Sequence, residues 1–213
     1  MSLLKPIRFT VAIDGPAASG KGTVAKGIAD HFGFKYLDTG LLYRAIGAEV
    51  LLGKDPINAA AKLAPSDMTL QSLRSPQVTK MASKVAAIPE VRATLLAFQK
   101  NFARQKGGAV LDGRDIGTII CPGAEVKIFI TASAELRALR RFRELHKNGL
   151  KTTYDVVLIE VKERDARDIS RKASPLKPAQ DAYILDTSDL NIETSLKRAI
   201  DVTHSGLKKV TQK

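Results

Sequence analysis

A glycine-rich loop with a single lysine is the first segment whose residue types suggest chemistry. The loop reads Gly15-Pro16-Ala17-Ala18-Ser19-Gly20-Lys21-Gly22-Thr23. Glycines let such a loop curl until its backbone N–H groups point inward at phosphate oxygens, and a helix that follows adds its positive end. Lys21 then supplies a point charge for the β- and γ-phosphates. We therefore predict that these nine residues bind the phosphates of ATP.

The residue after the lysine departs from the usual form of this loop. Most such loops place Ser or Thr there, whereas this chain has Gly22 and reaches Thr23 one position later. We therefore expect no direct metal ligation by a side chain, and expect Mg²⁺ to be held mainly by phosphates and water. The alternative is a glycine-rich turn with a stray lysine. The apolar strand before the loop and the helical pattern after it favour phosphate binding.

Strand-sized and helix-sized patterns alternate along the chain. Strands are expected at 9–14, 34–37, 109–111, 126–131 and 183–185, and helices at 21–31, 39–52, 76–87, 89–106, 134–147, 154–171 and 192–208. The stretch 54–75 is predicted to be a loop with little structure of its own. This alternation predicts an α/β fold, a five-stranded parallel sheet with helices on both faces, in one domain spanning 1–213.

Three acidic residues stand where predicted strands end. They are Asp14, Asp38 and Asp112, each followed by glycine or threonine. Ligands in parallel α/β folds bind beyond the carboxyl ends of the strands. The sequence therefore predicts a site for Mg²⁺ and phosphate at this edge.

Composition sets wider bounds. The formal net charge of +12 attracts anions, either nucleic acid or small phosphate compounds. No apolar run approaches the roughly 20 residues that cross a bilayer, and no secretory signal is expected before the first strand. Cys121 is the only cysteine, so no disulfide can form within the chain and a cytoplasmic setting is expected.

An ordered set of motifs resembles those of the cytidylate kinases, a family of P-loop nucleoside monophosphate kinases. The motifs are GKGT at 20–23, LDTG at 37–40 with YR at 43–44, SKVAAIP at 83–89 with VR at 91–92, DGRDIGT at 112–118, ERD at 163–165, Asp168, Arg171 and SPL at 174–176. The resemblance runs from about residue 9 to 187. It implies the P-loop NTPase fold and transfer of the γ-phosphoryl group of ATP to CMP or dCMP.

The resemblance also implies the parts of the acceptor site. Ser83, Arg92 and Asp115 are expected to face the cytosine; the other implied substrate-binding residues are Arg44, Arg114 and Arg171 at the monophosphate, Arg164 and Asp168 at the sugar, and Thr39 and Asp112 near the acceptor. A carboxylate can accept from the exocyclic amine of cytosine while arginine donates to ring acceptors. Uracil presents an oxygen in place of that amine, so Asp115 is expected to repel it.

Arginines on two predicted helices leave alternatives open. Arg164, Asp168 and Arg171 share one helix face, which could equally be a solvated face with Glu160–Arg164 and Arg164–Asp168 ion pairs. The family motifs favour substrate binding. Arg137, Arg140 and Arg141 share a face of the helix at 134–147, which could be a lid that closes over ATP or a basic solvated face.

The expected chemistry is in-line phosphoryl transfer, which depends on positioning and charge stabilisation. The acceptor phosphate has a second pKa of about 6, so no general base is needed. The predicted catalytic residues are Lys21, Arg114, Arg141 and Arg171, and Arg140 is expected to contact ATP. The lid is expected at about 137–153 and the monophosphate-binding region at about 40–107. Only 38 residues separate Arg44 from Ser83, so we expect this region to be shorter than in many members of the family.

The sequence is also compatible with functions other than phosphorylation of CMP or dCMP. A kinase of the same fold could use UMP, AMP or shikimate, and a basic protein could bind nucleic acid. An aromatic content of 5%, without Trp, argues against nucleic-acid binding. A P-loop protein that binds ATP without turnover is a third option, against which Lys21, Asp112 and Arg114 argue. We expect a monomer whose partners are ATP and CMP or dCMP, without nucleic acid or membrane.

Overall fold

The computed structural model describes residues 7–64, 67–68 and 71–212. Its strands are β1 (Thr10–Asp14), β2 (Lys35–Asp38), β3 (Ala109–Gly113), β4 (Val126–Thr131) and β5 (Tyr183–Asp186). They form one sheet of order β2-β3-β1-β4-β5, in which every pairing is parallel. The predicted α/β fold with a five-stranded parallel sheet is confirmed.

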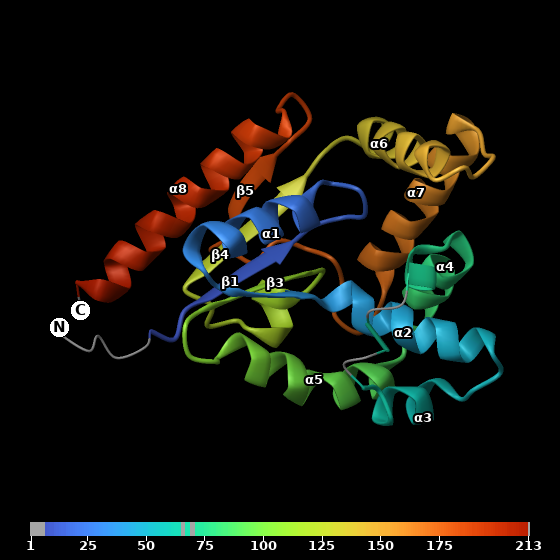
Figure 1. Ribbon diagram of the computed structural model, residues 1–213, viewed down its shortest axis with the longest axis horizontal. Coiled ribbons are helices and arrows are strands. Elements are labelled where there is room, and N and C mark those ends of the chain that lie inside the picture. Colours follow the sequence, from blue (N-terminus) through green and yellow to red (C-terminus); the bar gives the residue numbers. More distant parts are fainter. Residues whose placement is uncertain (1–6, 65–66, 69–70, 213) are drawn as a thin grey trace.

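Helices cover both faces of this sheet (Figure 1). The helical elements are α1 (Lys21–Phe32), α2 (Thr39–Leu51), α3 (Pro56–Ala61), η2 (Gln71–Arg74), α4 (Pro76–Val85), α5 (Pro89–Ala103), η3 (Ile116–Ile120), α6 (Ala134–Lys147), α7 (Tyr154–Ser170) and α8 (Ile192–Thr211). Helices α1 and α8 lie on one face of the sheet, and α5 lies on the other. Within the described residues, no helix is long and apolar enough to cross a membrane.

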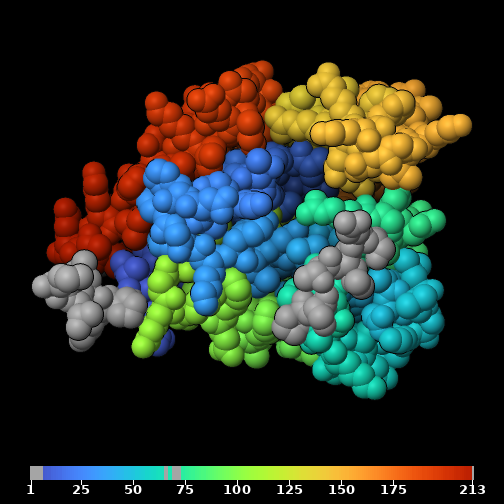
Figure 2. Space-filling model, in the orientation of Figure 1, coloured from blue at the N-terminus to red at the C-terminus, as the bar shows by residue number. Residues whose placement is uncertain are grey.

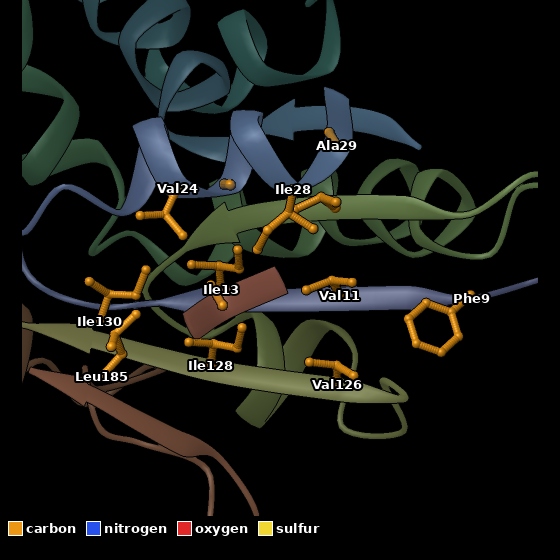
Figure 3. Close-up of a cluster of buried hydrophobic side chains, with 13 residues drawn as sticks. Phe9, Val11, Ile13, Val24, Ile28, Ala29, Val126, Ile128, Ile130 and Leu185 are labelled. Carbon is orange, nitrogen blue, oxygen red and sulfur yellow. The ribbon is translucent and has the colours of Figure 1, made fainter. Parts of the chain in front are cut away.

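The two faces of β1 build two separate parts of the core. Val11 and Ile13 pack with Val24 and Ile28 of α1, as Figure 3 shows. The residue between them, Ala12, packs on the opposite face in the cluster that contains Ala103 of α5. Successive side chains of a strand point to opposite faces, so a strand covered on both sides is apolar throughout. This double burial fixes β1, and with it the loop that follows.

The stretch at 54–75 is more structured than the sequence predicted. Helix α3 begins there because the Asp55 side chain accepts hydrogen bonds from the backbone N–H groups of Ile57 and Asn58, and Pro56 occupies the first turn. Ala59 and Ala60 pack against α2, and η2 follows. The prediction of a loop is wrong where the structure describes this stretch; residues 65–66 and 69–70 lie outside the described residues.

A short π-helix, η3, follows β3 and was not predicted. Asp14 at the end of β1 accepts from the backbone N–H groups of Ile116 and Gly117, at 2.7 and 2.8 Å. These bonds satisfy both carboxylate oxygens and hold η3 against the end of the neighbouring strand. The contact joins residues about a hundred positions apart, so no local sequence pattern predicts it.

Candidate active site

A cavity of about 1360 Å³ opens beyond the carboxyl ends of the strands, between the α6–α7 pair and the region from α2 to α4 (Figure 2). The glycine-rich loop forms one wall. Of the residues predicted to bind ATP or the acceptor, all except Gly15 and Pro16 line the cavity; Asp14 and Arg137 do not line it. The residues that the sequence analysis selected from far-apart motifs therefore meet in one place.

The glycine-rich loop takes its shape from a close backbone approach and a left-handed turn. A Cβ on Gly15, whose φ is +153°, would lie 2.0 Å from the carbonyl oxygen of Ile130. Gly20 caps α1 with φ +88°, a conformation that side chains rarely adopt. Helix α1 begins at Lys21, so its unpaired backbone N–H groups lie at the end of the loop, where an anion is favoured.

Limited space around Gly22 explains why glycine stands where most such loops have Ser or Thr. A Cβ at this position would lie 3.3 Å from Asp112 Oδ2 and 3.7 Å from the Tyr36 hydroxyl. A serine or threonine side chain would therefore crowd Asp112. The carboxylate of Asp112 takes the space that a loop hydroxyl would otherwise fill.

Lys21 and Asp112 lie on the floor of the cavity, and the charge of each affects the pKa of the other. Loss of hydration lowers the pKa of Lys21, and the Arg114 guanidinium lowers it further. Burial raises the pKa of Asp112, and the Asp38 carboxylate adds to the rise. The Oδ1 atom of Asp112 is buried and has no hydrogen-bond partner in the described part of the chain. A bound phosphate would therefore stabilise the charged form of Lys21, and a bound cation would stabilise the charged form of Asp112.

The expected site built on three strand-end carboxylates is wrong in one part. Asp14 is fully engaged with η3, and burial raises its pKa to about 6 despite these backbone hydrogen bonds. Asp38 caps α2 through the Gly40 N–H and pairs with Arg44 at 3.2 Å. Only Asp112 keeps an oxygen free of partners, and no cluster of three metal-ligating side chains occurs among the described residues.

Arginines outnumber their acidic partners beside this floor. Arg114 donates to Asp168 Oδ2 at 2.9 Å, in place of the Arg164–Asp168 ion pair considered from the sequence. Burial lowers the pKa of Arg164 to about 9, and the nearby Arg114 contributes. The Nε atom of Arg164 is buried without a partner in the described residues. Burial alone would raise the pKa of Asp168, but Arg114 and Arg164 bring it below its ordinary value. With Arg114 and Arg164 against the single carboxylate of Asp168, this cluster favours an anionic ligand.

A second network joins residues expected to face the base. Asp115 forms an ion pair with Arg92, and Arg171 Nη2 lies 3.9 Å from the other oxygen of Asp115. Ser174 holds both arginines: its hydroxyl accepts from Arg92 Nε at 3.2 Å, and its carbonyl accepts from Arg171 Nε. Arg171, expected at the monophosphate, therefore lies beside Asp115. Its pKa is lowered by burial and by Arg92.

Two contributors to this site were not found from sequence. Ser174 belongs to a matched motif but was given no role, and its φ of +55° is unusual for a residue other than glycine. Arg167 donates to Ser83 Oγ at 2.9 Å. The only sequence signal for Arg167 was its position between Arg164 and Arg171 on one helix.

The three arginines of α6 that were predicted to share one helix face, Arg137, Arg140 and Arg141, have different partners. Arg137 is 5% exposed; it donates to both oxygens of Asp165 and to the carbonyl oxygens of Ala17 and Ala132. It thus joins α6 to α7 and to the glycine-rich loop, so neither of the two alternatives considered from the sequence, a lid surface over ATP or a basic solvated face, holds for Arg137.

Arg140 and Arg141 keep contact with the cavity. Arg140 donates to Thr187 and to the carbonyl oxygen of Ser19 in the loop, at 2.8 to 3.4 Å. In the described part of the chain, Arg141 pairs with Glu144 alone, at 2.9 Å, and its side chain lines the cavity. Of the three, Arg141 is the least constrained by protein contacts.

A parallel sheet of this strand order, a glycine-rich loop between β1 and α1, and a pocket where that loop faces arginines define a P-loop kinase. Comparison with known proteins narrows the class. The model of the family "Cytidylate kinase" matches residues 11–71 and 52–205, and the chain belongs to this family.

Curated relatives match over most of their length. The cytidylate kinase of Cereibacter sphaeroides strain KD131 is 56% identical over 195 residues, covering 92% of this chain and 95% of the relative. That of Methylocella silvestris is 54% identical over 202 residues, covering 92% and 94%. A solved structure of an uncharacterized protein from Eubacterium ventriosum superimposes with a TM-score of 0.55 at 16% identity, covering 93% of this chain and 99% of that chain. This last likeness concerns the fold alone.

Proposed function

We propose that this protein transfers the γ-phosphoryl group of ATP to the phosphate of CMP or dCMP, giving CDP or dCDP and ADP. Its relatives carry the name of this activity at more than half identity over nearly the whole chain. The observation that carries the proposal is the buried ion pair between Asp115 and Arg92, which lines the same cavity as Ser83 and the phosphate loop.

The donor side is assigned to the glycine-rich loop. Its curled backbone and the start of α1 receive the phosphates of ATP, and Lys21 neutralises the β- and γ-phosphates. Arg140 steadies the loop through the Ser19 carbonyl and reaches the nucleotide from the α6 side. When bound, Mg²⁺ screens the charge of the transferred group, and the partnerless Oδ1 of Asp112 fits a water of its coordination shell.

The acceptor phosphate is assigned to three arginines that line the floor of the cavity, Arg44, Arg114 and Arg164. Arg44 and Arg114 each pair with one carboxylate, Arg164 Nε has no partner among the described residues, and a guanidinium binds phosphate through two parallel hydrogen bonds. Asp168 is placed to accept from a sugar hydroxyl while it holds Arg114. Thr39 donates its hydroxyl proton to the Asp112 carbonyl at 2.7 Å, so it meets the acceptor only through its lone pairs.

The base is assigned to Asp115 and its two arginines. Asp115 forms an ion pair with Arg92, and Arg171 Nη2 lies 3.9 Å from its other oxygen. Cytosine offers an amine to the carboxylate and ring acceptors to arginine, so it replaces part of this pairing without leaving a buried charge alone. Uracil brings an oxygen toward Asp115, which costs binding energy.

The chain's part in the reaction is positioning and charge stabilisation. The acceptor phosphate is already largely dianionic at neutral pH, because its second pKa is about 6. Lys21, Arg114 and Arg141 meet the negative charge that spreads over the transferred group, and closure of residues about 137–153 excludes water. We assign Arg171 to the same charge cluster, next to Asp115.

We also propose a cytoplasmic monomer that acts on small nucleotides, without a nucleic-acid or membrane partner. The monophosphate-binding region is assigned to about 40–107. The two matched segments of the family model overlap at 52–71, inside this region. The match to the family model is thus divided within this region, which supports a monophosphate-binding region that differs in length from the family's usual one.

Product analysis tests the activity directly. Protein incubated with ATP, Mg²⁺ and CMP is expected to yield equimolar CDP and ADP on anion-exchange chromatography. Formation of ADP without CDP would identify hydrolysis, and parallel reactions with shikimate would reveal a non-nucleotide acceptor.

A further inference from the structure

A contact between two helices on opposite sides of the cavity involves a residue with no role so far. Arg167 on α7 donates through Nη1 to Ser83 Oγ on α4 at 2.9 Å, although 84 residues separate them. Both residues line the cavity, and Ser83 is 6% exposed. The lower end of α7 lies next to α4 in Figure 1.

We propose that Arg167 is a positioning residue that fixes the direction of the Ser83 hydroxyl and thereby favours cytosine over uracil. The inference rests on the proposed function, because it needs a pyrimidine beside Ser83. It assigns Arg167 no contact with the substrate itself.

The argument follows from the donor and acceptor properties of the two groups. A guanidinium carries donors only, so Ser83 can meet Arg167 only as an acceptor. One lone pair of the hydroxyl is then taken by a charged donor, and the proton must point elsewhere. A charge-assisted bond also polarises the O–H group, which makes it a better donor.

A hydroxyl held as a donor distinguishes the two pyrimidines. The ring nitrogen N3 of cytosine is an acceptor, whereas N3 of uracil carries a hydrogen. A donor aimed at this edge gains a bond with cytosine and faces another donor with uracil. Asp115 applies the same selection with reversed polarity at the neighbouring exocyclic group.

The neighbouring cations cannot take over this task. Arg92 is engaged with Asp115, Ser174 and the carbonyl oxygen of Ala86. Arg171 is engaged with Ser174 and lies beside Asp115. Arg164 lies near Arg114 and Asp168. Among the described residues, Arg167 is the arginine that the hydrogen bonds place on Ser83.

A double-mutant cycle tests the proposal. The variants Arg167→Met, Ser83→Ala and the double variant are assayed for kcat and KM with CMP and with UMP. Each single variant is expected to lower the CMP-to-UMP ratio of kcat/KM about ten-fold, mainly through the KM for CMP. The double variant is expected to match Ser83→Ala, because Arg167 acts through that hydroxyl. Arg167→Lys should restore part of the ratio.

Lys162→Met, an exposed change on the same helix, serves as the matched control and should keep the wild-type ratio. A wild-type ratio in Arg167→Met, even with a lower melting temperature, would leave only a structural tie between α4 and α7 and overturn the proposal. Multiplying losses in the double variant would also overturn it. A wild-type protein that does not phosphorylate CMP would instead refute the proposed function itself.

Discussion

The phosphate-binding end of the cavity is a stretch of backbone, whereas the end assigned to the base is a network of side chains. At the first end, nine consecutive residues form the loop, and Gly15 and Gly20 allow its shape. At the second end, Arg92, Asp115 and Arg171 come from separate elements and hold one another. One end is specified locally, and the other exists only once the chain has folded.

The difference predicts how each end responds to damage. Removing the Lys21 charge from the loop takes a partner from the ligand, and within the protein it weakens only the interaction with Asp112, a carboxyl group whose pKa is already raised by burial. Removing a charge from the base network leaves another buried charge without its partner, which costs about 3–5 kcal/mol for a fully buried pair. Variants at the two ends should therefore separate loss of activity from loss of stability.

Lys21→Met should have the largest effect on turnover. We expect kcat to fall about 10³-fold, because the side chain meets the phosphates only through its charge. The melting temperature should hold or rise, since the variant no longer keeps a charged group in poorly hydrated surroundings. Coupled ADP-release assays and thermal melts measure both. A large drop in melting temperature would contradict the view that this end is built from backbone.

Asp115→Ala should lower kcat/KM for CMP about a hundred-fold and also lower the melting temperature, because Arg92 and Arg171 lose their shared carboxylate. Activity with UMP should fall less. Asp181→Ala is the matched control, since its ion pair with Lys127 is exposed on the aspartate side. Equal losses with CMP and UMP would remove Asp115 from base recognition.

Arg141→Ala should lower kcat about ten-fold while the KM for CMP stays near the wild-type value, as expected of a charge that acts on the transferred group. Steady-state kinetics with varied CMP measures this. Arg143→Ala, an exposed change on the same helix, should have no effect. Unchanged turnover in Arg141→Ala would exclude this residue from the mechanism.

Nucleotide binding should take up protons, the smallest effect of the set. The pKa of Lys21 is lowered in the free protein, so part of the lysine is neutral above neutral pH. Phosphate favours the protonated lysine, so its pKa rises on binding and affinity falls as pH increases from 7 toward 9. Calorimetry of ADP binding at pH 8, in buffers of different ionisation enthalpy, measures the uptake. Proton release would contradict this assignment.

Much of the fold could be predicted from the sequence because its determinants are local. Buried parallel strands are apolar throughout, so the strand at 126–131 was placed without error and the others within two residues. Helix α3 was missed although Asp55 and Pro56 form a start signal, because its alanine-rich sequence shows no amphipathic pattern. The π-helix η3 depends on the distant Asp14 and could not be predicted locally.

The site likewise has one part that local sequence predicts and another that depends on contacts between distant segments. The loop followed from its own residues. Asp115 and Arg92 were each expected at the base only through family resemblance, and the ion pair between them was not predicted, since no spacing rule joins these elements. Charge spacing on α6 indicated that Arg137 and Arg141 share a face. It could not indicate that Asp165 of α7 neutralises Arg137 and leaves Arg141 at the cavity.

The most direct test of the account is kcat/KM for CMP, dCMP, UMP and AMP, measured by ADP release with saturating ATP and Mg²⁺. The account predicts that kcat/KM for CMP or dCMP exceeds that for UMP and AMP by about a hundred-fold or more. The reason is that the base network hydrogen-bonds to only one arrangement of donors and acceptors. Equal values for CMP and UMP would contradict it, leaving a P-loop kinase whose buried network holds the fold without reading the base.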